Sequence, residues 1–295
     1  MPDEFKIGSP ILLVKDLEQM LAFYDRVFGL KRNRKKRGEE IDLGFNRKNG
    51  DSGNPLLVLK QDQKATEPPH NSAGLFHFAI LVPDRKSLAQ AYLAIRETKR
   101  AKFEGFGDHL VSESMYLHDP ERNGIEIYRD RPRNEWRHDE HGHIMMDTLP
   151  LDLDGILSEL SKDNQKTDNP FPNGARIGHM HLRVTSLERS LEFYHKKLGL
   201  DISADWSSMG AIFVSAGGYH HHIGLNIWHS LGGKPHVSGE AGLDAFTIEV
   251  PFNELLVKQF ELQLKGYIVT KVGERELLVA DPDGIRMIIK FVQKI

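Results

Sequence analysis

The stretch IGSPILLVKDLEQMLAFYDRVFGL, residues 7–30, aligns without a gap with IGHMHLRVTSLERSLEFYHKKLGL, residues 177–200. A second pair, GLFHFAILVP at residues 74–83 and GLDAFTIEVP at residues 242–251, shares Gly, Leu, Phe, Ile, Val and Pro. Repeats of this size indicate a duplicated supersecondary unit. The sequence therefore divides into four units, near residues 5–62, 73–130, 175–230 and 240–295.

Each unit follows the same coarse pattern of hydrophobic residues. An alternating apolar segment, typical of a strand, comes first, at residues 11–14, 76–82, 180–184 and 246–250. Helical periodicity follows and ends at Gly29 in the first unit and Gly199 in the third, where a helix C-cap glycine is common. Short strand-like segments complete each unit. The pattern predicts an α+β fold of four βαβββ modules, with an N-terminal pair at residues 5–130, a polar linker at 131–174 and a C-terminal pair at 175–295.

Composition excludes several classes of function. The 295 residues carry a formal net charge of −3 and no Cys, so the sequence does not favour nucleic-acid binding, thiolate catalysis or Cys-ligated metals. The sequence contains no run of 18 apolar residues, so it predicts no membrane span. The N-terminal MPDEFKIGSP lacks the apolar core of a signal peptide, so we expect a cytoplasmic protein. The 15 His residues leave imidazole and carboxylate as the available metal ligands.

The four units, with Phe-Tyr in the predicted helices of the first and third, resemble the vicinal oxygen chelate superfamily. That superfamily includes glyoxalase I, bleomycin- and fosfomycin-resistance proteins and extradiol dioxygenases. The resemblance covers nearly the whole chain. It implies that paired modules curl into two half-barrel cups, with metal ligands on the first and last strands of the modules.

Comparison of the repeats indicates which residues could be those ligands. At the equivalent first-strand position the four units carry, in order, Ser9, His77, His179 and Ala245. At the last-strand position only the second unit has a ligand, Glu126. Two imidazoles and one carboxylate are the facial triad of Fe(II) enzymes. His181, on the same strand face as His179, is a rival ligand. The second and third modules are then expected to share one cup, and the first and fourth the other.

A second resemblance surrounds Glu126. In order and spacing, the segment resembles the signature of extradiol dioxygenases at Gly107, His109, Met115, Tyr116, Asp119, Pro120 and Glu126. Arg122 stands where the signature has Gly or Pro. The fourth unit keeps an equivalent Asp-Pro turn but has Lys271 and Leu278 in place of His109 and Tyr116. The resemblance implies that His109 and Tyr116 hydrogen-bond substrate oxygens.

The segment GGYHHHIGLNIW, residues 217–228, resembles the His-His strand of the same enzymes. If it is a strand, His220, His222 and Asn226 share one face. His220 or His222 is expected to act as the acid–base catalyst, because imidazole titrates near neutral pH. The residues expected to contact substrate are His221, Asn226, Trp228 and Tyr128.

The resemblance thus implies a catechol 2,3-dioxygenase-type oxidoreductase of aromatic hydrocarbon catabolism. It would use Fe(II) and O2 to cleave catechol, or a substituted catechol, to a 2-hydroxymuconic semialdehyde. Three alternatives stay open: a glyoxalase-like metal-dependent lyase or isomerase, a hydroquinone-cleaving dioxygenase, and a metal-free binding protein of the resistance type. The expected partners are an aromatic diol and O2, and a homo-oligomer is compatible with the resemblance. The sequence leaves open the ring substituents and the choice between Fe and Mn.

Overall fold

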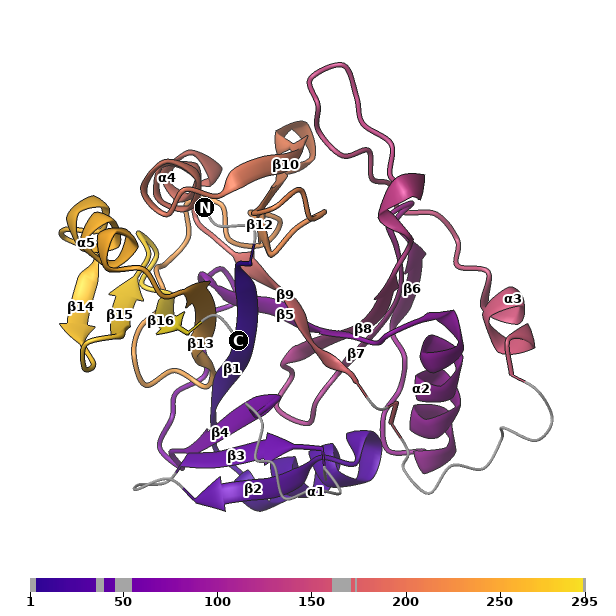
Figure 1. Ribbon diagram of the computed structural model, residues 1–295. Coiled ribbons are helices and arrows are strands. Elements are labelled where there is room, and N and C mark those ends of the chain that lie inside the picture. Colours follow the sequence, from indigo (N-terminus) through magenta and orange to yellow (C-terminus); the bar gives the residue numbers. More distant parts are fainter. Residues whose placement is uncertain (1–3, 36–39, 46–54, 161–170, 173, 294–295) are drawn as a thin grey trace. The chain divides into compact units, whose positions relative to one another are not determined.

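The computed structural model describes residues 4–35, 40–45, 55–160, 171–172 and 174–293. Its elements repeat βαβββ four times along the chain, as the repeats predict (Figure 1). The first module contains β1 (Lys6–Val14), α1 (Leu17–Phe28), β2 (Lys31–Lys35), β3 (Glu40–Gly44) and β4 (Leu57–Gln61). The second contains β5 (Gly74–Leu81), α2 (Arg85–Thr98), β6 (Gly105–Asp108), β7 (Ser112–His118) and β8 (Gly124–Asp130).

The described residues of the linker between the second and third modules include the short helices η1 (Arg133–Glu135) and α3 (Leu153–Ser158). The third module contains β9 (Arg176–Arg183), α4 (Leu187–Leu191), the π-helical turn η3 (Glu192–Lys197), β10 (Asp201–Trp206), the short helix η4 (Ser207–Met209), β11 (Ala211–Ser215) and β12 (Ile223–Asn226). The fourth contains β13 (Gly242–Pro251), α5 (Glu254–Gln263), β14 (Ile268–Lys271), β15 (Glu276–Ala280) and β16 (Arg286–Val292).

Helix α1 shows how the sequence sets the limits of an element. The Asp16 side chain accepts a hydrogen bond from the backbone N–H of Gln19, which caps the N-terminus. Gly29 ends the helix with φ of 69°, a left-handed conformation that glycine adopts without steric cost. Between these caps, Met20, Tyr24 and other apolar residues recur at helical spacing and are buried.

The strands form two eight-stranded sheets. Their orders are β14-β15-β16-β13-β1-β4-β3-β2 and β10-β11-β12-β9-β5-β8-β7-β6. The fourth and first modules therefore share one sheet, and the third and second modules share the other, as the ligand positions predict. In the second, third and fourth modules the first strand pairs in parallel with the last. A parallel pair needs a crossover connection, which the module's helix provides.

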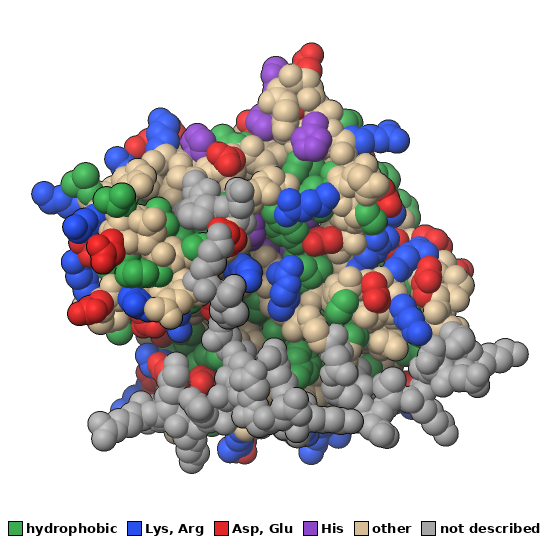
Figure 2. Space-filling model, viewed as in Figure 1, with side chains coloured by type: hydrophobic (Ala, Val, Ile, Leu, Met, Phe, Trp, Pro, Cys, Tyr) green, Lys and Arg blue, Asp and Glu red, His purple; other side chains and the backbone are tan. Residues whose placement is uncertain are grey.

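The chain forms two compact units. One contains Met1–Leu13, Lys64–Phe76 and Gly178–Ile295, and the other contains Val14–Gln63 and His77–Ile177. A division into independent pairs at residues 5–130 and 175–295 stays a prediction. On the face drawn in Figure 2, Lys and Arg side chains are intermixed with Asp and Glu. Of the helices in the described ranges, none has the length and hydropathy of a membrane span.

The Asp-Pro turn of the second module is fixed by buried hydrogen bonds. The Tyr24 hydroxyl, on α1, donates to Oδ2 of Asp119 at 2.8 Å. Oδ1 of Asp119 accepts from the backbone N–H groups of Glu121 and Asn123. Burial raises the pKa of the Asp119 carboxyl to about 6 and the pKa of the Tyr24 phenol well above its usual value. The Glu121 carboxylate then accepts from the backbone N–H of Lys15, at the end of β1.

The fourth module repeats this arrangement with the third. Tyr194 donates to Oδ2 of Asp281 at 2.9 Å, and Oδ1 of Asp281 accepts from the N–H groups of Asp283 and Ile285. Burial raises the pKa of the Asp281 carboxyl to about 7. The Asp283 carboxylate accepts from the N–H of Thr185, which is equivalent to Lys15.

Arg122 is not the Gly or Pro expected at this position, but its backbone has the same conformation as the equivalent residue of the fourth module. Its φ is 67°, and the equivalent Gly284 has φ of 80°. Both residues therefore adopt the left-handed conformation. For a residue with a side chain this conformation costs about 1 kcal/mol.

Replacement of Tyr194 by Phe should destabilise the protein by about 1–3 kcal/mol. The change removes the O–H donor of the Asp281 carboxylate, which is 4% exposed, and a buried acceptor without its donor carries the full desolvation cost. Urea unfolding measures the change. The control is Tyr92→Phe, because the Tyr92 hydroxyl makes no hydrogen bond within the described ranges; it should change the unfolding free energy by less than about 0.5 kcal/mol. Equal effects of the two replacements would contradict the structural role of Tyr194.

Candidate active site

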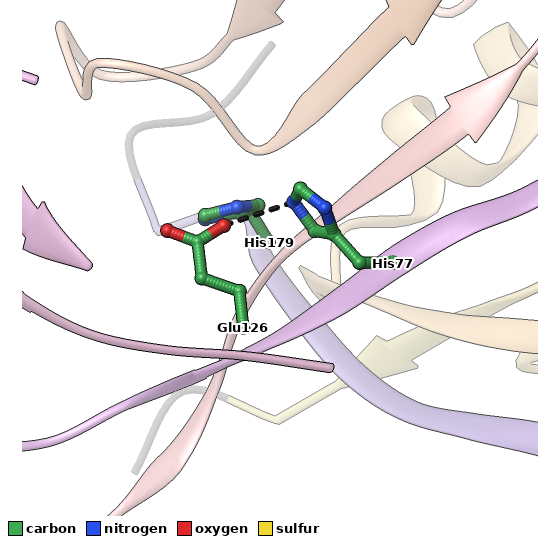
Figure 3. Close-up of side chains that lie close together, drawn as sticks. All are labelled: His77, Glu126 and His179. Carbon is green, nitrogen blue, oxygen red and sulfur yellow. Dashed lines mark ion pairs between the residues drawn. The ribbon is translucent and has the colours of Figure 1, made fainter. Parts of the chain in front are cut away.

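His77 and Glu126 come from neighbouring parallel strands, β5 and β8. Ala79 is the residue opposite Glu126, and His77 lies two residues before Ala79, so the two side chains are on the same face of the sheet. Both are buried, with exposed fractions of 6% for His77 and 3% for Glu126. Nε2 of His77 lies 2.9 Å from Oε2 of Glu126 (Figure 3).

His179 lies on β9 and is 1% exposed. One candidate ligand atom from each of His77, Glu126 and His179 lies within 4.8 Å of the other two (Figure 3). Two imidazoles and a carboxylate in such a group suit a divalent transition metal. We find no second group of this kind in the part of the chain that the structure describes, and the rival ligand His181 does not belong to this one.

His181 is packed among aromatic rings. Its ring centroid lies 5.0 Å from that of Phe76, 5.8 Å from Phe213 and 5.6 Å from Trp228. Gly224, opposite His181 on β12, leaves room for the imidazole, because a Cβ there would come within 3.0 Å of the ring. A glycine at this last-strand position of the third module therefore has a packing reason.

The pairing of β7 with β8 places Tyr116 beside Glu126. The two residues are direct partners in the antiparallel register of β7 and β8. The Tyr116 hydroxyl lies 2.7 Å from Nε2 of His109, and its ring lies 5.6 Å from that of His77. Burial and the charge of Glu126 raise the pKa of the Tyr116 phenol well above its usual value, so the hydroxyl stays protonated at neutral pH.

His109 is oriented by the linker. Its Nδ1 lies 2.8 Å from the backbone carbonyl oxygen of Asp147. A carbonyl oxygen only accepts, so Nδ1 carries a hydrogen and donates it. In the neutral imidazole Nε2 is then the acceptor of the Tyr116 O–H, and in the imidazolium Nε2 donates to the Tyr116 oxygen. The charge state of His109 therefore decides where the phenolic hydrogen points.

The three consecutive histidines precede the strand that they were expected to begin. Strand β12 starts at Ile223, so the alternation assumed for His220 and His222 does not apply to them. The ring of His221 is 4.1 Å from that of His179, and the ring of His220 is 6.2 Å away. The Nδ1 atoms of His220 and His221 are 2.8 Å apart, so one of them donates a hydrogen bond to the other.

His222 has different surroundings. Its Nδ1 accepts from the backbone N–H of Ala216 at 3.3 Å and lies 3.0 Å from the Ser215 hydroxyl. Its ring is 4.9 Å from that of Phe5. These contacts fix the orientation of the His222 ring within its loop.

The other residues expected to contact substrate are placed as follows. Asn226 is fully buried at the end of β12, and Trp228, just beyond it, is 44% exposed. Tyr128 packs with Ala79 and Leu81 on the face that also carries Glu126. Roles in substrate binding stay predictions for all of them.

Two features were missed in the sequence. The carbonyl group of Asp147 belongs to the backbone, so no side-chain pattern signals its contact with His109. Arg183 ends β9 on the face of His179 and His181, and the period of two along that strand was the available signal.

Four βαβββ modules with a buried His-Glu-His group define a modular protein with a candidate metal centre. Residues 6–127 and 176–250 match the model of the Glyoxalase/Bleomycin resistance protein/Dioxygenase superfamily. The chain belongs to this superfamily.

Individual relatives agree with this assignment. A Bacillus subtilis (strain 168) protein named catechol-2,3-dioxygenase is 40% identical over 282 residues, which cover 95% of each chain. Glyoxalase I from Zea mays has the same fold, with a TM-score of 0.57 at 19% identity over 98% of this chain and 92% of the maize chain. A putative dioxygenase from Bacillus subtilis subsp. subtilis str. 168 gives a TM-score of 0.60 at 13% identity, over 97% and 84% of the two chains.

Tyr116 should remain un-ionised in the folded protein at pH 10, where an ordinary tyrosine is about half ionised. Absorbance at 295 nm, recorded from pH 7 to 10, should therefore change by the same amount in the folded wild type and in Tyr116→Phe. In concentrated guanidinium chloride, which is the control, the wild type at pH 10 should show about half a tyrosinate per chain more than the variant. A difference of that size between the folded proteins would contradict the raised pKa.

Proposed function

We propose that this protein is an extradiol dioxygenase that uses Fe(II) and O2 to cleave a catechol to a 2-hydroxymuconic semialdehyde. The observation that carries the proposal is the grouping of His77, Glu126 and His179 in a chain 40% identical, over nearly its whole length, to a protein named catechol-2,3-dioxygenase. The cytoplasmic location expected from the sequence belongs to the same proposal.

The donor set supports a catalytic metal. Two neutral imidazoles and one carboxylate leave three adjacent coordination positions open on an octahedral ion. Nε2 of His77 and Oε2 of Glu126 are 2.9 Å apart, and a ligand atom of His179 lies within 4.8 Å of both, so the three side chains would hold a single ion. When bound, Fe(II) would supply adjacent positions for the diol and O2 and a path for electrons between them.

Tyr116 and His109 provide a route for one proton. A diol that binds beside Glu126 must lose a proton, and the Tyr116 oxygen can accept it while the phenolic proton passes to Nε2 of His109 over 2.7 Å. The Asp147 carbonyl oxygen holds Nδ1 of His109 in place during this transfer. With His109 charged, the Tyr116 O–H is free to donate to a substrate oxygen in a buried site, where a hydrogen bond is stronger than in water.

The acid–base role expected of His220 or His222 is best assigned to the His220–His221 pair. The contact of the His221 ring with that of His179 and the hydrogen bond between the two Nδ1 atoms support this choice. A linked pair can deliver a proton at one imidazole and replace it through the other. His222 has its Nδ1 occupied by Ala216 and Ser215, which favours a structural role.

The proposal is tested by anaerobic reconstitution with Fe(II), metal analysis and a panel of catechols and hydroquinones, with ring cleavage followed by product absorbance. His77→Ala, Glu126→Ala and His179→Ala should each weaken metal binding by about 100-fold or more, since loss of an outer-shell partner alone costs about 10–100-fold. The matched control is His118→Ala, because His118 is half-buried and pairs with Glu104 at 2.8 Å.

The outcomes separate the alternatives. Ring cleavage of hydroquinones and not of catechols would contradict the catechol assignment and identify a hydroquinone-cleaving dioxygenase. Metal binding without cleavage of any diol would contradict dioxygenase activity. Unchanged metal binding in the three alanine variants would contradict the metal centre itself.

His221→Phe should keep the metal and slow turnover by about 10²–10⁴-fold, the usual contribution of a general acid–base catalyst. His222→Phe, which removes a ring of the same kind from a neighbouring position, should have a smaller effect on turnover. Steady-state kinetics and metal content are measured on the same samples. Equal turnover in the wild type and His221→Phe at full metal loading would refute the assignment.

A further inference from the structure

Arg183 is a half-buried cation without a counter-charge among the described residues. It ends β9, and its Nε is inaccessible to solvent and has no hydrogen-bond partner. Burial lowers the pKa of its guanidinium, and no carboxylate among the described residues makes an ion pair with it. Arg129 shows the usual alternative, since its Nε donates to Glu113 at 2.7 Å. A donor that is withdrawn from water without an acceptor is costly, so the Nε–H group of Arg183 requires an explanation.

The repeats show that the fold does not require a cation at this position. Residues equivalent to Arg183 are Leu13 in the first module, Leu81 in the second and Glu249 in the fourth. Leu13 and Leu81 are 4% and 7% exposed, so the same position is ordinarily part of an apolar core. A side chain confined to one copy of a repeat is more consistent with ligand binding than with packing.

A second donor lies next to Arg183. Asn226 on β12 is its direct partner in the parallel register, so both side chains leave the sheet on the same face. Asn226 is fully buried, and its Nδ2 has no hydrogen-bond partner. Its Oδ1 accepts from the backbone N–H of Trp228 at 3.4 Å. The Nε–H group of Arg183 and the Nδ2–H group of Asn226 are therefore two adjacent donors that both lack an acceptor.

The strand places these donors in line with the candidate metal ligand. His179, His181 and Arg183 alternate along one face of β9, with about 13 Å between the first and last Cα atoms. Between them the His181 ring contacts Phe76 and Trp228, which gives this part of the face an aromatic surface. A flat ring bound near His179 would extend along these side chains toward Arg183.

We propose that Arg183 and Asn226 bind a carboxylate on the substrate, so that the preferred substrate is a catechol with an acidic side chain. The inference rests on the proposed function, because it assumes that the diol end is held near His179. A guanidinium matches a carboxylate in plane and can donate two parallel hydrogen bonds from Nε and one Nη. The Asn226 amide adds a third donor to the same acceptor.

Binding to the metal-free protein tests the subsite without any turnover. Phenylacetate should bind about 10-fold or more tightly than phenylacetamide, which has the same shape and no charge, because hydrogen bonds to charged groups are the stronger class. Arg183→Met should abolish the preference. The matched control is Arg176→Met, which removes the same charge from an exposed position on β9 and should retain the preference. Equal affinity of the wild type for the two probes, or a preference that survives Arg183→Met, would overturn the inference.

Kinetics of the Fe(II) enzyme give the second test. The probes are 3,4-dihydroxybenzoate, 3,4-dihydroxyphenylacetate and 3-(3,4-dihydroxyphenyl)propionate, each compared with its amide. For the acid of best length, kcat/KM should exceed that of the amide by about 10–100-fold. Arg183→Met should remove this ratio and Arg183→Lys should restore part of it, since Lys keeps the charge and loses the planar fork.

The two proposals fail separately. Cleavage of catechols with no preference for the acids would contradict the carboxylate subsite and support the dioxygenase activity. Failure to cleave any diol, together with phenylacetate binding that depends on Arg183, would contradict the dioxygenase activity and support the anion site.

Discussion

A buried tyrosine–carboxylate hydrogen bond is the interaction on which the arrangement of the modules depends. Tyr24 donates to Asp119, and Tyr194 donates to Asp281, so the helix of an odd-numbered module is fixed to the last turn of the next module. Burial raises the pKa of both carboxyl groups, which shows that each is held where a charge is disfavoured. The hydroxyl and two backbone N–H groups offset that cost at each turn. The Phe-Tyr repeat in the sequence is therefore half of a structural contact whose other half is the Asp-Pro turn.

The tyrosine–carboxylate hydrogen bonds and the pairing of strands connect different pairs of modules. Hydrogen bonds between helix and turn connect the first module to the second and the third to the fourth, whereas the sheets combine the fourth with the first and the third with the second. The β7–β8 hairpin is where the two kinds of connection meet. Its turn contains Asp119, and its two strands carry Tyr116 and Glu126 as direct partners. Anchoring the turn therefore limits the movement of both side chains, which is the preorganisation that a catalytic site needs.

The repeats predicted most of the fold, because an apolar pattern that recurs four times reports the module even where a single copy is ambiguous. They also selected His77, His179 and Glu126, since each is a ligand-type residue at a position that other copies fill differently. The prediction for the three histidines was wrong in its structural premise, as alternation orders side chains only within a strand and β12 begins at Ile223. The contact between His109 and the Asp147 carbonyl joins residues 38 positions apart through a backbone atom, so no local pattern contains it.

Differences between the four modules distinguish residues that maintain the fold from candidate functional residues more clearly than burial does. The second and fourth modules both keep the Asp-Pro turn, and only the second has a phenol and an imidazole beside it. Along the first strands, the third module has His179, His181 and Arg183 where the first has Ser9, Ile11 and Leu13. Leu13 and Arg183 occupy equivalent positions, but only Arg183 places a polar group, its Nε–H, out of contact with both water and an acceptor. A fold that accepts leucine there does not need arginine for its packing, and this difference between the copies is what supports the proposed anion subsite on this face.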